Sequence, residues 1–485
     1  MNSIDKDVLS GSFLESALLI KNCIESIKSI KRWSENIKKD YEMKIERIHF
    51  NQLVEWKFEK RTKTLYHSTG KFFRIEGIRV KTNFYSIKEW DQPIIVQPEI
   101  GILGIITKKF NGVRYFLMQA KIEPGNINSV QLSPTVQATR SNYTRVHLGE
   151  EPKFLEYFIN KSKSKILIDR LQSEQGARFL KKRNRNMIVE IDDDIKVPND
   201  FCWMTLGQIK ELLKIDNFVN MDSRSVISCI QFIDLEIRQM INQIVLHDSS
   251  SINICSYELT GFNKDIFCSY TEKQRAVNSK NDLINWFTEM KANYNCSIKK
   301  IPLDDTKNWE IKSDEIKHIS NSFFSIIAVS VKAKNREVSK WTQPLIWQKS
   351  IGLVGFLCKK INGVLHFLIR AKVESGYFDI LEMSPTVTTS DINYRISKNN
   401  SPHFVNYFIE PISDKVHYSV LLSEEGGRFF NYQNKYMIVE IDYSESPKIP
   451  ENYIWMTLGQ LMDFIQYDNY VSIEVRTLFS LMNFR

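Results

Sequence analysis

Cysteine is scarce in this chain and is not arranged for cross-linking. Seven cysteines occur among 485 residues, an odd number, and no two of them have Cys-x-x-Cys spacing. Neither a disulfide framework nor a structural zinc site is therefore expected. Reduced thiols are typical of the cytoplasm, and we expect a cytoplasmic protein.

Long apolar runs are lacking as well. No stretch approaches the roughly 20 apolar residues that span a bilayer. The apolar segment 12–20 contains Glu15 and has no small-residue cleavage site. The sequence predicts an amphipathic helix there, rather than a signal peptide, and no contact with a membrane.

The chain also has no large excess of one charge. Its 66 Lys and Arg residues face 57 Asp and Glu residues, which gives a net charge of +9, and the basic residues are scattered among acidic ones. This pattern favours a solvated, mildly basic surface over nucleic-acid binding. A small substrate that carries phosphate is compatible with the same charge.

The common catalytic signatures are missing. The sequence contains no Walker loop, no Gly-x-Gly-x-x-Gly after a strand, no His-Glu-x-x-His and no Gly-x-Ser-x-Gly. These absences argue against ATP use, a bound dinucleotide cofactor and a zinc hydrolase.

What the chain does contain is an internal repeat, which is the first feature to seek in a long sequence. Segments of the first half recur in the same order in the second half, with a nearly constant offset. The matched segments begin at Trp90 and Trp341, Asn111 and Asn362, Ser133 and Ser384, Ser173 and Ser423, Met187 and Met437, and Trp203 and Trp455.

The repeat defines the expected domains. Each copy spans about 200 residues, an ordinary domain size. We expect a first module over 1–239 with an N-terminal helical segment, a linker over 240–282 that becomes helical near its end, and a second module over 283–485.

Local patterns in both copies predict a mixed β-sheet with flanking helices, an α+β fold. Asn111-Gly112 lies between β-rich runs at 102–110 and 113–122, which is a strong hairpin signal. Thr205 to Gln208 fits a capping box that opens a helix. The segment 173–181 is expected to be helical and 187–191 to be a strand.

One polar segment follows the first hairpin and is the best candidate for a site. Residues 119–126 and 131–147 supply acids, bases and hydrogen-bond donors within thirty residues. The second copy retains many of them but replaces Arg140 by Asp391 and has no evident counterpart of His147. An arginine that binds phosphate cannot become aspartate and keep that role. The comparison predicts one working site, in the first copy, and one altered site.

In these segments and others the chain resembles the NDP-hexose 2,3-dehydratases. The resemblance covers nearly the whole chain, including its duplication, and the motif at 133–145 is highly specific. It rests on the segments 92–104, 119–126, 131–147, 172–176 and 184–187.

The resemblance implies a fold, a substrate and an assembly. The fold would be a tandem duplication of a Nudix-like module, and the protein would form a homodimer. The substrate would be dTDP-4-keto-6-deoxyglucose or a related nucleotide sugar. One pocket per subunit would be catalytic, and the pocket of the second module would be vestigial. The sequence has no Nudix box, whose carboxylates hold the Mg²⁺ that cleaves a pyrophosphate.

The implied reaction sets the roles to be filled. A base removes the C3 proton, which the 4-keto group acidifies, and the C2 hydroxyl leaves with help from an acid. The product is a 3,4-diketo-2,6-dideoxyhexose nucleotide. No redox cofactor is needed, because oxidation at C3 balances reduction at C2. No metal is expected either, because the sequence shows no clustered set of metal ligands. Two other functions stay open: a nucleotide-sugar hydrolase of the Nudix type and a non-catalytic nucleotide-sugar-binding protein.

Candidate residues for these roles come mainly from the polar segment. The acid and base candidates are Tyr143, Glu123 and His147, although Glu123 and Tyr143 recur in the second copy and could equally be structural. The substrate-binding candidates are Arg140 and Arg145 for the diphosphate and Gln119, Lys121, Gln131, Thr135 and Asn142 for hydrogen bonds. Trp90, Trp203 and the Phe72-Phe73 pair are candidates for stacking on the base, and His67 could reach the pocket from a neighbouring loop. Core packing is the favoured role of the two tryptophans.

Overall fold

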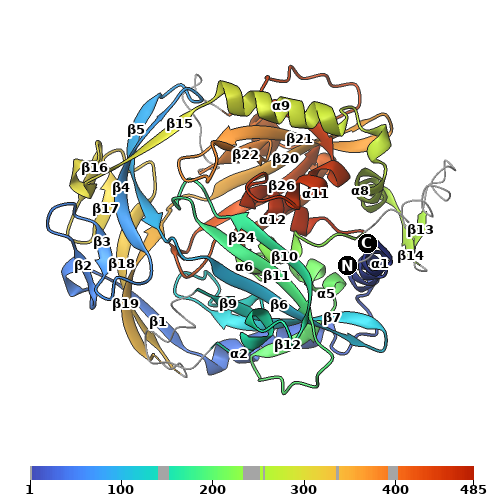
Figure 1. The fold of residues 1–485 in the computed structure, drawn as a ribbon, viewed down its shortest axis with the longest axis horizontal. Helices are drawn as coiled ribbons and strands as arrows, with labels where there is room; N and C mark the ends of the chain where they lie inside the picture. Colours follow the sequence, from blue (N-terminus) through green and yellow to red (C-terminus); the bar gives the residue numbers. More distant parts are fainter. Residues whose placement is uncertain (1–2, 140–151, 233–251, 255–256, 335–337, 391–401) are drawn as a thin grey trace.

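The computed structural model describes residues 3–139, 152–232, 252–254, 257–334, 338–390 and 402–485 (Figure 1). Its first half contains α1 (Ser3–Leu18), α2 (Ile27–Asp40), β1 (Met43–Ile48), the 3-10 turn η1 (Phe50–Gln52), β2 (Trp56–Phe58), β3 (Leu65–His67), β4 (Arg74–Thr82), β5 (Glu89–Val96), β6 (Gly101–Phe110), β7 (Val113–Ile122), β8 (Val130–Ser133), β9 (Val136–Ala138), α4 (Glu156–Ile159), β10 (Lys165–Ser173), β11 (Arg183–Glu190), β12 (Phe201–Met204), α5 (Leu206–Leu212) and α6 (Met221–Ile227).

The second half repeats this order. It contains β13 (Ile252–Ile254), β14 (Tyr257–Leu259), α8 (Gly261–Thr271), η2 (Lys273–Arg275), α9 (Lys280–Asn293), β15 (Cys296–Ile301), η3 (Leu303–Asp305), β16 (Trp309–Ile311), β17 (Glu315–His318), β18 (Ser325–Ala333), β19 (Lys340–Trp347), β20 (Gly352–Ile361), β21 (Val364–Val373), β22 (Leu381–Ser384), β23 (Val387–Thr389), α10 (Asn406–Ile409), η4 (Ser413–Lys415), β24 (Val416–Ser423), β25 (Phe429–Phe430), β26 (Gln433–Glu440), β27 (Tyr453–Thr457), α11 (Leu458–Ile465) and α12 (Ile473–Leu481).

The predicted α+β duplication is confirmed. Each half builds a seven-stranded mixed sheet: β10-β11-β6-β7-β12 with β8 and β9 in the first, and β24-β26-β20-β21-β27 with β22 and β23 in the second. In both, one parallel pair, β11 with β6 or β26 with β20, interrupts the antiparallel order.

The turn and cap predictions are confirmed as well. Asn111 and Gly112 both adopt positive φ (50° and 84°), as a type I′ hairpin turn requires. The Thr205 side chain accepts a hydrogen bond from the backbone N–H of Gln208 and opens α5. Thr457 does the same for α11.

A second pair of sheets is formed by exchange of strands between the halves. Strand β1 of the first half pairs with β18 of the second, from Met43 opposite Ala333 to Ile48 opposite Ala328. Strand β15 of the second half pairs in return with β4 of the first. Figure 1 shows blue β1 beside the yellow strands β18 and β19, and yellow-green β15 beside blue β4. Neither half therefore completes its sheets alone.

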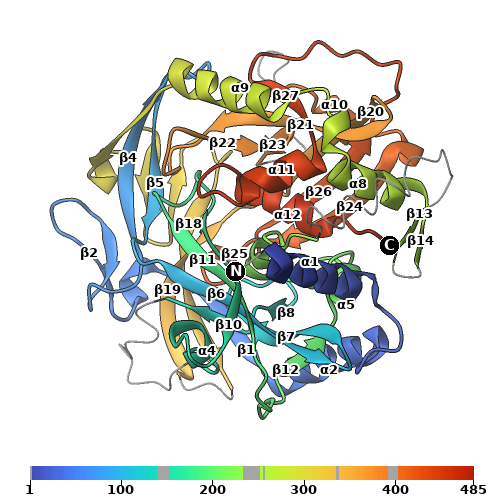
Figure 2. The same cartoon turned by 45° about the vertical axis from the view of Figure 1, so that its right-hand side comes forward.

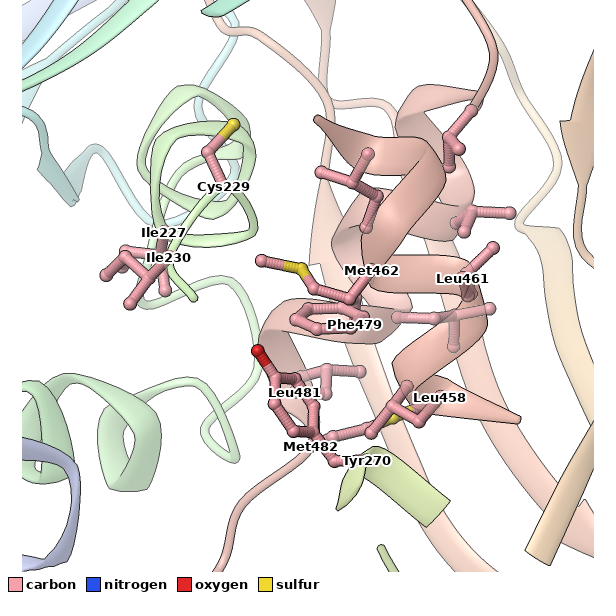
Figure 3. Close-up of a cluster of buried hydrophobic side chains, with 14 of the residues drawn as sticks. Ile227, Cys229, Ile230, Tyr270, Leu458, Leu461, Met462, Phe479, Leu481 and Met482 are labelled. Atoms are coloured by element: carbon pink, nitrogen blue, oxygen red, sulfur yellow. The ribbon is translucent and has the colours of Figure 1, made fainter. Parts of the chain in front are cut away.

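The two halves also share one core. The largest buried cluster takes side chains from both halves, including Ile227 of α6 and Cys229 and Ile230 just after it, and Met462 and Phe479 of the second half (Figure 3). The C-terminal residue lies beside this core at the end of α1, where the Arg485 guanidinium donates to the Leu18 carbonyl (Figure 2). The modules are thus one folding unit.

Helix α8 lies within the segment 240–282, predicted to become helical near its end, and it occupies the place that α1 has in the first half. The Ser269 hydroxyl donates to the Leu365 carbonyl and accepts from the Leu458 N–H. Ser16 of α1 makes the same two bonds with the Arg114 carbonyl and the Leu206 N–H. Among the described residues, no helix is both long and apolar enough to cross a membrane.

The prediction of a helix over 173–181 is wrong. Strand β10 runs to Ser173, and the following residues form tight turns up to β11. Backbone bonds to the other half decide the outcome, because the Lys181 N–H donates to the Gly376 carbonyl and the Gly176 carbonyl accepts from the Gly376 N–H. Tertiary hydrogen bonds of this kind override a local helical preference.

Candidate active site

The loop that follows β7 interlocks with a turn of the second half. The Gly125 N–H donates to the Gly426 carbonyl at 2.8 Å, and the Asn431 N–H donates to the Gly125 carbonyl at 2.9 Å. A Cβ atom on Gly125 would lie 1.5 Å from the Phe429 carbonyl oxygen. Only glycine can approach this closely, and the contact places Glu123 and Glu425 side by side.

Four acidic side chains meet at this interlock and form what we call the carboxylate cluster: Glu123, Glu174, Asp222 and Glu425. Glu123 comes from the end of β7, Glu174 from the end of β10, Asp222 from α6 and Glu425 from the second half. The first three are buried. A Cβ atom on Gly427 would lie 3.1 Å from one Glu425 oxygen and 3.6 Å from one Glu123 oxygen, so both carboxylates face the same point.

The cluster has oxygens that no described residue satisfies. Glu123 Oε1 contacts Lys121 Nζ at 3.3 Å and accepts from the Gln137 amide at 3.1 Å, but Oε2 has no hydrogen-bond partner in the described part of the chain. Glu174 Oε1 accepts from Asn184 at 2.6 Å, and its Oε2 is likewise without a partner there. Buried oxygens of this kind are uncommon and indicate a place for a ligand.

Burial and mutual repulsion raise the pKa values of Glu174, Asp222 and Glu425. Burial, and after it the charge of Glu425, raises the pKa of Glu174 to about 7. Burial and then the charges of Glu425, Glu174 and Glu123 raise the pKa of Asp222 well above its ordinary value. Burial also raises the pKa of Glu425. Close carboxylates cannot all ionise, so the carboxylate cluster can hold a proton donor and a proton acceptor together at neutral pH.

Two basic groups link the cluster to a neighbouring cavity. Lys182 donates to the Glu99 carbonyl, and burial lowers the pKa of Lys182 to about 8. The Arg428 guanidinium lies over the Phe73 ring, 4.4 Å from its centroid. Both Glu99 and Phe73 line a cavity of about 590 Å³, which is within the range of small-molecule sites.

The cavity has an aromatic wall and a rim of mixed charge. Its aromatic side chains are Tyr66, His67, Phe72 and Phe73, its basic ones are Arg61, Lys71 and Arg74, and its acidic ones are Glu59, Glu76 and Glu99. Phe72 adopts φ of 70°, a conformation that is strained for an aromatic residue and is often found at functional sites. Together, the cavity, Lys182, Arg428, Lys121 and the carboxylate cluster form what we call site one.

The equivalent place in the other half, site two, differs in chemistry. Its matching residues are Lys372, Glu374, Glu424, Tyr432 and Glu474, with Gln175 entering from the first half in the place that Glu425 has in site one.

Tyrosines fill site two. The Tyr377 ring is buried, and it would lie 2.5 Å from a Cβ atom on Gly176. In site one the equivalent residue is the smaller Asn126, whose Oδ1 would lie 2.1 Å from a Cβ atom on Gly426. Tyr432 replaces Lys182, and the Gln175 amide bonds Glu424. Site two therefore has a tyrosine where site one has the Lys182 cation, whereas it keeps Lys372 and also Arg178, which lies over Phe324 as Arg428 lies over Phe73.

The structure brings some of the sequence candidates together and separates others. Lys121 and Glu123 lie in site one, and His67 lines its cavity, where its ring contacts Glu55 at 3.4 Å and Thr69 at 2.8 Å. Arg140, Asn142, Tyr143, Arg145 and His147 lie outside the described residues.

The remaining candidates have structural contacts. Gln119 donates to Asp200 at 2.9 Å, and buried Gln131 donates to the Ser423 hydroxyl at 2.7 Å. The Thr135 hydroxyl joins β6 and β7 by bonding the Ile106 N–H and the Leu117 carbonyl. Trp90 donates to Gln92, and Trp203 packs edge-on against Phe110.

Sequence reasoning missed Glu174, Lys182, Asp222, Glu425 and Arg428. They lie between about 50 and 300 residues from the polar loop, and only the fold brings them to Glu123. A signal was nevertheless present, because the repeated turn reads Glu174-Gln175-Gly176 in one copy and Glu424-Glu425-Gly426 in the other. Among the described residues, no group of three His, Cys, Asp or Glu side chains has an arrangement suited to a metal ion.

Comparison with known proteins identifies the family of the chain. The family model for NDP-hexose 2,3-dehydratase matches residues 27–230 and 280–482, once for each half. Three relatives carry the name dTDP-4-dehydro-6-deoxy-alpha-D-glucopyranose 2,3-dehydratase. The one from Saccharopolyspora spinosa is 41% identical over 467 residues, 96% of this chain and 93% of the relative. That from Amycolatopsis orientalis is 40% identical over 90% of this chain and 86% of the relative. That from Streptomyces violaceoruber is 37% identical over 90% and 92%. The chain therefore belongs to the NDP-hexose 2,3-dehydratase family.

Proposed function

We propose that this chain removes the C2 hydroxyl of dTDP-4-keto-6-deoxyglucose, or of a closely related nucleotide sugar, and that it does so in site one. The observation that carries the assignment to site one is the set of buried carboxylates with unpartnered oxygens beside an aromatic cavity. Elimination needs an acid and a base at one place, and a cluster that keeps a proton among several carboxylates supplies both.

Glu123 is placed to act as the base. One of its oxygens is held by Lys121 and Gln137, which orients the group, and the other is presented without a protein partner among the described residues. In the proposed reaction Glu123 takes the C3 proton, and the electron pair moves into an enolate at C3 and C4. A cation near the developing oxyanion stabilises it, and Lys121 and Lys182 are the cations that flank the cluster.

The cavity is suited to the nucleotide part of the substrate. Tyr66, Phe72 and Phe73 offer aromatic surfaces on which a nucleobase can stack. Arg428 lies between this wall and the carboxylate cluster, where a diphosphate would pass. Arginine binds phosphate through paired, planar hydrogen bonds.

The experiment is incubation with dTDP-4-keto-6-deoxyglucose, followed by trapping of the adjacent diketone with o-phenylenediamine and mass spectrometry. Loss of one water and a trapped product support the dehydratase. Release of thymidine monophosphate would instead support a hydrolase, and an unchanged substrate that still binds would support a sensor. Substrate turnover should be lost when Glu123 is changed to Gln and retained when its counterpart Glu374 is changed to Gln.

We also propose the finer structural assignments that the resemblance implies. These are a Nudix-like topology for each module, a homodimer and a cytoplasmic location. Light scattering of the purified protein tests the dimer, because a chain of 57.0 kDa should then give twice that mass.

A further inference from the structure

Glu425 enters site one from the second half of the chain. The turn that carries it is held from both sides. Within the turn, the Arg428 and Phe429 N–H groups donate to the Glu425 carbonyl, and across the interlock the Gly125 N–H donates to the Gly426 carbonyl. The backbone that carries Glu425 is therefore held in place by hydrogen bonds within the turn and across the interlock.

The counterpart of Glu425 is Gln175, and the difference changes the chemistry of the pair it forms. In site two the Gln175 amide donates to Glu424, the counterpart of Glu174, so a neutral donor faces a carboxylate. In site one the counterpart is a second carboxyl group, and the charge of Glu425 helps to raise the pKa of Glu174. Two carboxyl groups at such positions retain one proton between them. Gln175 cannot supply such a proton to a substrate.

The location of this proton suits the reaction. In a glucose-configured chair, the C3 hydrogen and the C2 hydroxyl are gauche to each other, so the groups that act on them must be neighbours. Glu123 and Glu425 are such neighbours, since one oxygen of each lies within 3.6 Å of the same point, the position of a Cβ atom on Gly427.

We infer that the second half of the chain supplies a catalytic residue to site one, namely Glu425, which protonates the departing C2 hydroxyl. This inference rests on the proposed function. As the enolate returns to a ketone, the C2–O bond breaks, its electron pair stays on oxygen, and the Glu425 proton completes a molecule of water. The proton that Glu123 took from C3 then passes to Glu425, so both groups return to their initial states. The 2,3-enol product takes a proton at C2 from solvent, its C3 hydroxyl releases a proton to solvent, and the 3,4-diketone results.

The second half is then more than a relic of duplication. It fills its own pocket with Tyr377 and Tyr432, yet Glu425 and Arg428 from its turn contribute to the pocket of the first half. The ionisable groups that act on Glu425 are Glu123, Glu174, Asp222, Lys121, Lys182 and Arg428.

The test uses the full chain and the substitution Glu425→Gln, which has nearly the same shape as the native side chain. We expect kcat to fall by about 10²–10⁴-fold with little change in KM, since an acid acts only in the transition state. In D₂O the variant should still exchange the C3 hydrogen of the substrate, because Glu123 and enolate formation are intact. The matched control is Glu374→Gln at the other interlock, which should retain wild-type kcat.

Several outcomes separate the possibilities. Wild-type kcat in Glu425→Gln overturns the inference, and so does loss of C3 exchange together with turnover, which would make Glu425 the base or a positioning residue. A wild-type protein that neither exchanges C3 nor releases water refutes the proposed function itself. Glu425→Asp provides a second check: an acid predicts that Asp is more active than Gln, whereas a purely structural role predicts that Gln, the better fit, is more active.

Discussion

A single methyl group added at Gly125 should separate the two halves of site one. In Gly125→Ala, the new Cβ atom would lie 1.5 Å from the Phe429 carbonyl oxygen, a backbone atom that cannot turn aside as a side chain can. The loop must withdraw, and the two interlocking hydrogen bonds to Gly426 and from Asn431 are lost with it.

The expected loss of stability follows from these contacts. Each lost backbone hydrogen bond costs about 0.5–1.5 kcal/mol, and overpacking of a tight contact costs about 1–3 kcal/mol. The free energy of unfolding of Gly125→Ala should therefore fall by about 2–6 kcal/mol, as measured by urea denaturation followed by circular dichroism. Gly376→Ala should behave similarly, because its Cβ atom would lie 1.7 Å from the Phe179 carbonyl oxygen.

A nearby glycine provides the control. In Gly427→Ala the closest atoms to the new Cβ are carboxylate oxygens at 3.1 and 3.6 Å, which can move. The equivalent residue of the first half is already alanine, Ala177. The unfolding free energy of this variant should stay within about 0.5 kcal/mol of the wild type. If Gly125→Ala proves as stable as Gly427→Ala, the loops do not interlock as described.

Four further predictions concern metal, the two sites, charge and the loop. Turnover should be unaffected by excess EDTA, since the Nudix carboxylates are missing; loss of activity that Mg²⁺ restores would support the hydrolase instead. Lys121→Ala should reduce kcat/KM far more than Lys372→Ala at equal folded fraction, and equal losses would mean that site two also works. The pKa of Glu174 is raised to about 7 in the folded chain from an ordinary 4.5. The free energy of unfolding should therefore fall as the pH rises between these two values, because the unfolded chain loses this proton more readily than the folded chain, and the loss remains at higher pH. Urea titrations should accordingly show Glu174→Gln more stable than wild type at pH 8, by up to about 3 kcal/mol, with the difference shrinking towards pH 5. Tyr143→Phe should lower kcat at least about a hundredfold while calorimetry still shows nucleotide binding; a near-normal rate would make Tyr143 structural.

Local sequence signals predicted those parts of the fold that local physics determines. The hairpin at Asn111-Gly112 depends on two adjacent residues with positive φ, and the cap at Thr205 depends on one side chain and one N–H three residues later. Such features need no knowledge of the rest of the chain, and both were found in each copy.

Features that depend on the other half of the chain could not be predicted in this way. The alternation along β1 shows which of its faces is buried, but the same alternation fits a neighbour in either half, and the strand in fact pairs with β18. The helix expected over 173–181 does not form, because the decisive contacts of this segment are with Gly376, about 200 residues away. Local sequence signals contain no information about such contacts. For the same reason the sequence identified Lys121 and Glu123, which share one strand and its loop, but not Asp222 or Glu425.

The exchange of strands explains how a duplicated chain can keep one altered site without losing its second half. Once β1 completes the sheet of the second half and β15 that of the first, removal of either half leaves the other with an open sheet edge. The second pocket was then free to change, and Tyr377 and Tyr432 could fill it, because its scaffold is still required. The same interlock brings the turn with Glu425 against Glu123. The second half has glutamate at this position, where the first half has Gln175. A difference in the second half thus alters the chemistry of the site in the first half. If site one is the active site, as we propose, selection for its activity acts on residues of both copies, because the interlock brings residues of both copies to this site.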